Sequence, residues 1–362
     1  MTAVPASAAA QRLGGGSPQR AQLRRFLAVS GFTLFATMVA SAFLMPLVYM
    51  IATSFKDANQ TSTPGAPLFP AKPETFTYEG EEHPVYEVPT PDGQVHSWAL
   101  IEPHRESSTF IDPANVDAGP IEWEGRYRTL EQSWSFGLDT SNFTRAWNIL
   151  DFPRMFFNTF AIAALSTIGA VASAICVAYG FSRFRFPGRN GLFLVMIATI
   201  ILPFQVTLIP TYAVYFAFGW VGTWLPLIVP HFFANAYNVF LLRQYFLTIP
   251  RDLDEAAMID GAGPFRILRS VIIPQAMPAI VAVSLFHFFW AWNEYFLPLV
   301  YLQSVPDLQP LSVGLGQFNA LYSAEPTVVQ AAALMAMALP VVIFFMAQRA
   351  FMRGVVFGGV EK

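Results

Sequence analysis

The amino-acid sequence predicts an all-α membrane protein with six transmembrane helices and a β-rich extracytoplasmic insertion. Of its 362 residues, 54% are hydrophobic and 12% are charged, whereas soluble globular domains carry about 25% charged residues. Uncharged runs long enough to cross the hydrocarbon core, which takes about 20 apolar residues in a helix, recur along the chain. Arginines cluster at the ends of these runs, and one acidic polar segment separates the first run from the others.

The N-terminal part of the chain is expected to contain a tail and the first helix. Residues 1–19 are rich in Ala, Gly, Ser and Pro and predict a disordered cytoplasmic tail. Arginines then precede an uncharged run over 26–55, which is too long for the roughly 7–15-residue core of a cleaved signal peptide. The first transmembrane helix is therefore placed at 20–56, and Pro46 is expected to bend or end it.

Five further helices are expected in a membrane core over 154–348, which a C-terminal tail over 349–362 follows. Residues 190–242 contain no charge and are about twice as long as one crossing requires, so a turn near Gly219 and Gly222 should divide them into two helices. The five helices are placed over 155–181, in the two halves of 190–242, over 274–301 and over 327–347.

The basic residues determine the expected orientation in the membrane, because cytoplasmic loops carry an excess of Lys and Arg close to the ends of spans. With six helices, the loops of the opposite side are the segment 57–153, a short turn at 217–223 and residues 302–326. Both termini and the loop over 250–274 are therefore expected to be cytoplasmic. The arginines of that side are Arg20, Arg24, Arg25, Arg183, Arg185, Arg189, Arg243, Arg251, Arg266, Arg269, Arg349 and Arg353.

The loop over 250–274 is polar between two apolar runs and predicts two short helices joined by a tight turn. Pro250 breaks the preceding helix, and acidic residues fill the first turn of the next one, where the helix dipole favours them. Gly261 is placed for a left-handed C-cap, and Pro264 is placed to open the second helix. The acidic residues of the first turn are Asp252, Asp254 and Glu255.

The spacing within this loop resembles the EAA loop of ABC importer permeases. Glu255-Ala256-Ala257 is followed by Gly261 and then by Val271-x-Ile273-Pro274, where that family has Glu-Ala-Ala, Gly and Ile-x-Leu-Pro. In the family this loop is a coupling helix that sits in a socket on a cytoplasmic ATPase; a plain connection between two spans is the alternative interpretation. The resemblance implies an ATPase-coupling role for Asp252, Glu255, Ala256, Ala257, Asp260, Gly261, Pro264 and Phe265.

Further motifs resemble the carbohydrate-uptake permeases of the maltose-permease type. Residues 291–299 (AWNEYFLPL) are similar to the Trp-Asn-Glu-x-x-x-Pro signature of these permeases. Residues 353–360 (RGVVFGGV) are similar to the glycine-rich tail of the maltose-type permease, which reaches between the two ATPase subunits. The segments 157–159, 178–183 and 201–210 also look like this class.

This resemblance implies a type I ABC importer permease fold in the plasma membrane of a bacterium or archaeon. The expected partners are a cytoplasmic ATP-binding subunit dimer, a second homologous permease subunit and an extracytoplasmic solute-binding protein, besides the lipid bilayer; nucleic acid is not expected. The chain itself is expected to bind no cofactor, with ATP and Mg²⁺ held by the partner subunits. The implied function is import of a sugar or oligosaccharide by alternating access, driven by ATP hydrolysis on those subunits.

The sequence carries no motif of a nucleotide-hydrolysing or membrane-embedded enzyme. Its lysines, Lys56, Lys72 and Lys362, follow no glycine-rich phosphate-binding loop, and His-Glu-x-x-His and Gly-x-Ser-x-Gly are absent. The single cysteine, Cys176, permits neither a disulfide framework nor a cysteine metal site. The chain is therefore expected not to be an enzyme, to hold no catalytic residue and to bind no metal.

Polar and aromatic residues of the predicted spans are candidates for the substrate path: Asn158, Gln205, Trp292, Asn293 and Glu294. Glu294 is the only acidic residue of a predicted span, and a carboxylate in a membrane is costly unless it faces water or a partner. An equally weighted alternative is that Glu294 lies near the outer membrane–water interface and is simply hydrated. His231 and His287 are expected to be packing residues rather than proton relays. An ion-coupled secondary transporter or channel using Glu294 and the histidines is the alternative function, disfavoured because no internal repeat is visible.

The segment 57–153 departs from the family pattern, in which the first external loop is much shorter. It carries 16 acidic and 5 basic residues, a net charge of −11. β-prone runs over 75–78, 85–88 and 95–101 predict a small β-rich module. We expect it to be a docking surface for the binding protein or the partner permease, since a patch of one sign steers a partner of the other. The alternative is that the segment is a solvated decoration, that is, a solvent-exposed addition that docks no partner.

Overall fold

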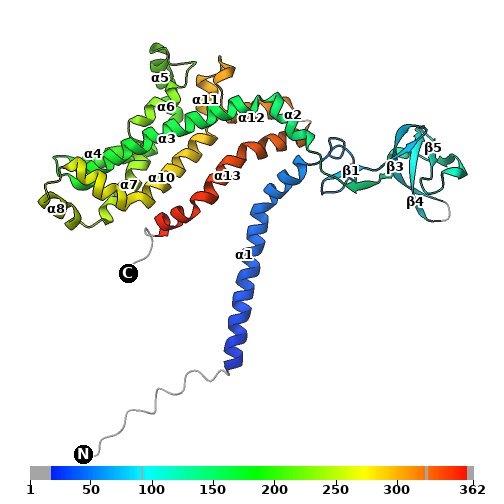
Figure 1. The fold of residues 1–362 in the computed structure, drawn as a ribbon, viewed down its shortest axis with the longest axis horizontal. Helices are drawn as coiled ribbons and strands as arrows, with labels where there is room; N and C mark the ends of the chain where they lie inside the picture. Colours follow the sequence, from blue (N-terminus) through cyan, green and yellow to red (C-terminus); the bar gives the residue numbers. More distant parts are fainter. Residues whose placement is uncertain (1–17, 91–92, 323–324, 357–362) are drawn as a thin grey trace, which may run out of the picture. The chain divides into compact units, whose positions relative to one another are not determined.

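The computed structural model describes residues 18–90, 93–322 and 325–356 (Figure 1). The expected disordered tail falls mostly on residues 1–17, and part of the glycine-rich C-terminal tail falls on residues 357–362, both outside the described residues. The chain divides between Ala52 and Thr53 into two compact units.

The first unit holds most of a single long helix, α1 (Pro18–Ser54). Most apolar side chains along its candidate span Arg25–Ser54 are exposed, as expected for a helix that meets lipid. Pro46 lies inside α1 and does not end it. Proline removes one backbone hydrogen bond from a helix, a loss that membrane-spanning helices tolerate.

The second unit contains a helical core and a β-module. Its helices are α2 (Ser141–Ile149), α3 (Phe152–Arg183), α4 (Arg189–Ala198), α5 (Phe204–Ala217), α6 (Leu225–Ile228), α7 (Ala236–Thr248), α8 (Asp252–Ile259), α9 (Pro264–Ile267), α10 (Ile273–Asn293), α11 (Phe296–Tyr301), α12 (Leu311–Leu321) and α13 (Pro326–Val356). A π-helical turn over Leu268–Ile272 joins α9 to α10.

Helix α3 packs along both α7 and α10 and forms the centre of the helical core. Small residues on α3, such as Ala174 and Ala178, meet large side chains of α7, such as Leu242 and Phe246, in one buried cluster. Gly169 of α3 lies under the ring of Phe232, where an added Cβ would come within 2.4 Å of the ring. This close approach requires glycine.

Among the described residues, five helices are long and apolar enough to cross a membrane, and a sixth span results if the bent pair α4–α5 is one span. The expected third span is therefore not a straight helix: its two parts meet at 97°. Leu202 and Pro203 are extended at the break. The physical reason is Pro203, which lacks an N–H and restricts the residue before it to extended conformations.

The expected fifth span over 274–301 is also interrupted, between Asn293 and Phe296, where α10 ends and α11 begins. The following segment, 302–326, was expected to be an external loop but contains α12. Leu311, Val313 and Phe318 of α12 are buried. Tertiary burial of this apolar face stabilises a helix that the short segment did not indicate by itself.

The β-module lies within the expected insertion. The first and last strands, β1 (Ala71–Pro73) and β8 (Trp134–Phe136), form a separate antiparallel pair. The strands between them form an antiparallel sheet in the order β2-β3-β4-β5-β6, in which β7 also pairs with β3. The strands of this sheet are β2 (Thr75–Tyr78), β3 (Glu81–Pro89), β4 (Val95–Glu102), β5 (Ser107–Ile111), β6 (Ile121–Glu124) and β7 (Glu131–Gln132). One face buries Val88, Trp98, Leu100 and Phe110.

Local sequence determines the first hairpin of this sheet. Glu79 and Gly80 both have positive φ, 51° and 88°, and form the two-residue turn between the paired residues Tyr78 and Glu81. Turns of this kind match the twist of the flanking strands.

The ends of the insertion are tied together by the buried Asn142, whose Nδ2 donates to the carbonyls of Ser54 and Lys56 at 3.1 and 2.9 Å.

Candidate functional site

Helix α8 and the turn after it have the local structure that the sequence predicts. The acidic first turn of α8 follows Pro250, and Gly261 has a φ of +78° in the left-handed region. The backbone N–H groups of Gly261 and Ala262 donate to the carbonyls of Met258 and Ala257 at 3.0 and 2.9 Å. These two bonds are a Schellman motif, which satisfies the carbonyls at the end of the helix.

The turn between α8 and α9 presents apolar side chains to the outside. Ile259 is 86% exposed and Phe265 is 76% exposed, and Met258 is exposed as well. Met258 and Ile259 were not among the predicted coupling residues, whereas Phe265 was. Of the remaining predicted residues, Ala257 is half-buried and the rest are exposed: Asp252, Glu255, Ala256, Asp260, Gly261 and Pro264. Large apolar residues exposed together mark a surface that a partner covers, so these residues form one candidate interface.

Buried polar contacts attach α8 to the end of α3. Asp254 and Arg183 form an ion pair, with side chains 9% and 6% exposed and 3.0 Å between Oδ2 and Nε. Arg183 Nη2 also donates to the carbonyl of Ile249 at 3.0 Å, and the Tyr179 hydroxyl donates to the carbonyl of Pro264 at 3.1 Å. The surface turn is therefore connected to a membrane-spanning helix.

Burial raises the pKa of the Asp254 carboxyl above its ordinary value, and Arg183 and Arg251 offset part of this effect. Asp254 Oδ1 has no hydrogen-bond partner among the described residues. From the sequence, Arg183 was expected to mark the cytoplasmic side and to belong to the family-like segment 178–183, and Asp254 was expected to interact with the helix dipole. Their pairing joins residues distant in sequence, and nothing in the local pattern indicates it.

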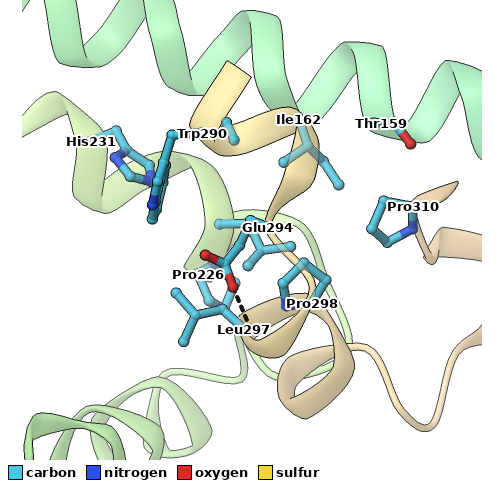
Figure 2. A pocket seen from close by; sticks show the side chains of 11 residues that line it. Thr159, Ile162, Pro226, His231, Trp290, Glu294, Leu297, Pro298 and Pro310 are labelled. Atoms are coloured by element: carbon cyan, nitrogen blue, oxygen red, sulfur yellow. Dashed lines mark hydrogen bonds between the residues drawn. The ribbon is translucent and has the colours of Figure 1, made fainter. Parts of the chain in front are cut away.

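Glu294 lies at the break between α10 and α11. Its Oε1 accepts hydrogen bonds from the backbone N–H groups of Phe296 and Leu297 at 3.0 and 3.1 Å, so the carboxylate caps α11. The same side chain lines a small cavity of about 30 Å³, beside His231 and Trp290 (Figure 2). Glu294 is thus a capping residue that also faces a cavity.

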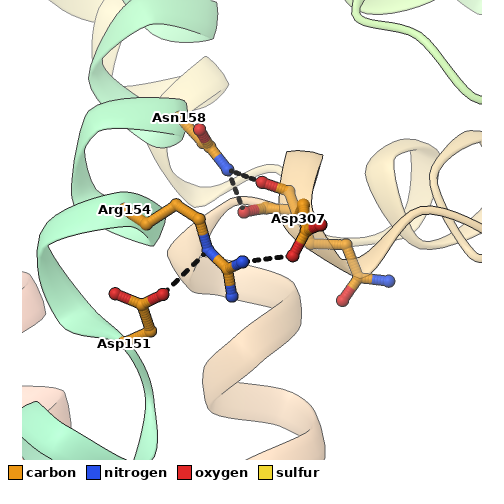
Figure 3. Close-up of polar contacts among 5 residues, drawn as sticks. Asp151, Arg154, Asn158 and Asp307 are labelled. Carbon is orange, nitrogen blue, oxygen red and sulfur yellow. Dashed lines mark hydrogen bonds and ion pairs between the residues drawn. The ribbon is translucent and has the colours of Figure 1, made fainter.

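The other predicted path residues lie elsewhere. Asn158 is buried, and its Nδ2 donates to the carbonyls of Asp307 and Gln309 at 2.8 and 2.9 Å (Figure 3). Beside it, Arg154 bridges Asp151, at 3.1 Å, and Asp307. Asn158 therefore anchors the segment that precedes α12.

Trp292 is buried against Phe156, with ring centroids 5.5 Å apart, and belongs to the core. Asn293 is exposed and its Nδ2 donates to the carbonyl of Phe289 at 2.7 Å. Gln205 is exposed on α5. Of the five predicted path residues, all of which the structure describes, Glu294 alone lines the cavity of Figure 2.

Trp290 also lines a second, larger cavity of about 390 Å³. It is lined by Asn235, Tyr237, Asn238, Phe286, His287 and Trp290. His231 and His287, which were expected to be packing residues, lie edge to face with their ring centroids 4.8 Å apart. Within the described ranges, no three His, Cys, Asp or Glu side chains gather in a way that could hold a metal ion.

Comparison with known proteins gives the family. Residues 167–356 match the family described as binding-protein-dependent transport system inner membrane component. The osmoprotective compounds uptake permease protein GgtD of Synechocystis sp. is 36% identical over 211 residues, covering 57% of this chain and 70% of that protein. The sn-glycerol-3-phosphate transport system permease protein UgpE of Escherichia coli is 35% identical over 251 residues, covering 68% and 86%.

The fold has a counterpart among solved structures. A bacterial ABC transporter involved in the import of the acidic polysaccharide alginate contains a chain that superposes with a TM-score of 0.63 at 20% identity, covering 90% of this chain and 96% of that one. The apolar helices agree with a multi-pass inner-membrane protein. The family match spans more than half of the chain and includes α8 and its turn, so the chain belongs to the inner-membrane permease components of binding-protein-dependent ABC transporters.

Proposed function

We propose that this chain is one of two permease subunits of an importer that moves a sugar or oligosaccharide across the plasma membrane by alternating access. ATP and Mg²⁺ are held by a pair of cytoplasmic ATP-binding subunits, and an extracytoplasmic binding protein delivers the substrate. Both termini of this chain are cytoplasmic. The chain itself carries out no hydrolysis and supplies the membrane path and the coupling surface.

The observation that carries this proposal is the exposed apolar surface at the α8–α9 turn. Ile259 and Phe265 lie in a polar loop between spans, where water would otherwise surround them. Burying such side chains in a partner is favourable by about 1.5–3 kcal/mol each. Because Asp254 connects the same helix to α3, movement of a partner bound here would reach a span directly.

The substrate class rests on the relatives. One is named for the uptake of osmoprotective compounds and the other for the transport of sn-glycerol-3-phosphate. The sequence motifs resemble carbohydrate-uptake permeases. We therefore assign a sugar or a related polyol to this chain.

Reconstitution in proteoliposomes tests the proposal. The chain is purified with the ATP-binding, second permease and binding-protein subunits encoded beside it, and uptake of radiolabelled sugars is measured with ATP enclosed. We expect uptake that requires ATP and the binding protein and that persists when ion gradients are collapsed. Uptake by this chain alone under an ion gradient would establish the secondary-transporter alternative instead.

A further inference from the structure

A cavity of about 620 Å³ lies in the β-module, at one end of its sheet. Residues 103–106, which form the loop between β4 and β5, line one side of it, and residues 126–129, which follow β6, line the other. Strands β5 and β6 are antiparallel neighbours in which Ser107 pairs with Glu124. The start of β5 and the end of β6 therefore lie side by side, which brings the two loops together.

Hydrogen bonds hold both loops in place. The buried Ser108 closes the β4–β5 loop, because its Oγ accepts from the backbone N–H of His104 at 3.1 Å and donates to the carbonyl of the same residue at 3.2 Å. The backbone N–H of Gly125 donates to the carbonyl of Glu106 at 2.7 Å and joins the two loops. The cavity is thus preformed, which lowers the entropic cost of binding a ligand in it.

The cavity gathers positive charge in a segment that is otherwise acidic. The segment 57–153 has 5 basic and 16 acidic residues, yet three of the five basic residues, Arg105, Arg126 and Arg128, line this cavity. Among the lining residues the one carboxylate is that of Glu106, so the lining as a whole is positive. At an ionic strength of about 0.15 M, charges more than about 8 Å apart are largely screened. A ligand in the cavity would therefore interact mainly with these arginines.

The three arginines have no counter-charge in the part of the chain that the structure describes. All three are exposed, and none takes part in an ion pair there. Arg128 Nε donates to the Tyr127 hydroxyl at 3.3 Å, which orients the guanidinium beside the ring. Guanidinium groups bind carboxylate and phosphate through paired N–H···O bonds. Neighbouring like charges repel one another, and a bound anion would remove that cost.

We propose that this cavity is a binding site for a small organic anion, recognised through its carboxylate or phosphate group. The arginines bind the oxyanion, and the half-buried Tyr127 ring offers an apolar surface to the carbon skeleton of the ligand. The volume lies within the about 300–1,000 Å³ typical of small-molecule sites, which favours a free ligand over a protein surface. The site belongs to the β-module and not to the membrane helices, so it goes beyond the proposed function.

Thiol protection in the complete transporter tests this site without requiring ATP. In a Cys176→Ser background, Pro103→Cys and Thr129→Cys place the single thiol of this chain on one or the other loop. Labelling by an uncharged maleimide is measured with glucose, glucuronate or glucose 6-phosphate, which share a ring and differ in charge, at constant ionic strength. Val116→Cys, exposed on the module but outside the cavity, is the control position.

We expect glucuronate or glucose 6-phosphate to slow labelling at 103 and 129 by about tenfold at a concentration near ten times its dissociation constant, while labelling at 116 stays unchanged. The more protective anion identifies the recognised group. Equal protection by glucose would overturn the ligand class, and absence of protection by both anions would overturn the site. Protection by the binding protein alone would show a protein contact and would overturn the small-molecule proposal.

Arginine variants then separate recognition in the cavity from the field of the whole segment. Arg126→Gln should raise the half-protecting concentration by about tenfold or more, the effect of a lost charge-assisted hydrogen bond. Arg145→Gln removes the same charge from the segment outside the cavity and should leave that concentration unchanged. An equal rise in both variants would overturn local recognition by the arginines. Because none of these readouts involves uptake, failure of this inference would leave the proposed function standing.

Discussion

Arg183 and Asp254 form a buried ion pair, 3.0 Å between Nε and Oδ2, that joins the end of α3 to the first turn of α8. Two arginines add hydrogen bonds around this pair. Arg183 donates to the carbonyl of Ile249, and Arg251 donates to the carbonyl of Ser182 at 3.4 Å. The pair is thus the charged centre of a junction between a span and the proposed coupling surface.

Removing one partner of this pair should destabilise the transporter strongly. Asp254→Leu leaves the Arg183 guanidinium buried without a counter-charge, and breaking a buried pair in this way costs about 3–5 kcal/mol. We expect a lower melting temperature of the purified complex and a loss of ATP-driven uptake. The double variant Arg183→Met with Asp254→Leu should recover most of the stability but not the coupling.

The exposed pair Arg145–Glu325 provides the matched control, because both side chains are more than a third exposed. Exposed ion pairs contribute about 0–1 kcal/mol, so Arg145→Gln should leave the melting temperature nearly unchanged. If Asp254→Leu and Arg145→Gln lowered the melting temperature equally, the buried ion pair would contribute no more to stability than the exposed one.

Gly261 should tolerate only residues that accept a left-handed backbone. Its φ is +78°, and no atom lies within 4 Å of an added Cβ, so the effect of substitution is backbone strain alone. Gly261→Val should cost about 1–2 kcal/mol and disturb the turn that presents Ile259, whereas Gly261→Asn should be milder. Substrate-stimulated ATPase activity of the complex is the measurement. Wild-type activity in Gly261→Val would mean that the turn geometry does not matter.

Ile259 should contribute to ATPase binding by burial of its side chain. Because it is 86% exposed in this chain, Ile259→Asp should not change the stability of the membrane subunit. It should weaken binding of the ATP-binding subunits by about 2 kcal/mol or more, as expected for a charge placed in a desolvated contact. Copurification at graded concentrations measures this, with Ile259→Leu as the apolar control. If the ATP-binding subunits copurified with Ile259→Asp as well as with the unaltered chain, Ile259 would not lie in the interface.

Adjacent residues at the end of α10 should differ in accessibility. Asn293 is exposed and Trp292 is buried. In a background lacking Cys176, Asn293→Cys should therefore react with a membrane-impermeant thiol reagent and Trp292→Cys should not. Labelling of neither position in any nucleotide state would place this end of the helix against a partner instead of the external solution.

The elements that sequence reasoning predicts well are those determined locally. Composition and uncharged runs suffice for the membrane class, and the acidic first turn and Gly261 suffice for α8 and its C-cap. The bend between α4 and α5 could also have been anticipated, because Pro203 interrupts the run. Pro46, which was expected to bend or end the first helix, does not end α1.

Features that depend on contacts distant in sequence were not predictable. The pairing of Arg183 with Asp254 and that of His287 with Asn238 each join different helices. The positive φ of Ala234, between α6 and α7, has no glycine to indicate it, since the strain is accepted for the sake of tertiary packing. Asn158 looked like a path residue because it is polar in a span, yet its amide is used by the backbone of the 307–309 segment.

The β-module should contribute to capture of the binding protein, and the structure shows where it can be removed. The pair β1–β8 closes the base of the module, so a short Gly/Ser linker in place of 75–132 leaves Ala71–Pro73 paired with Trp134–Phe136. The tie from Asn142 to the carbonyls of Ser54 and Lys56 is also retained.

We expect this variant to assemble with the ATP-binding subunits as the intact chain does. It should need a higher binding-protein concentration for half-maximal uptake, because the removed segment lies in the region of net charge −11 that would steer a basic partner face. The difference should shrink as ionic strength rises above about 0.15 M, where the Debye length falls below about 8 Å. Uptake is measured against binding-protein concentration at low and at high salt. An identical concentration dependence at low salt would reduce the module to a solvated decoration, since a steering field is strongest there.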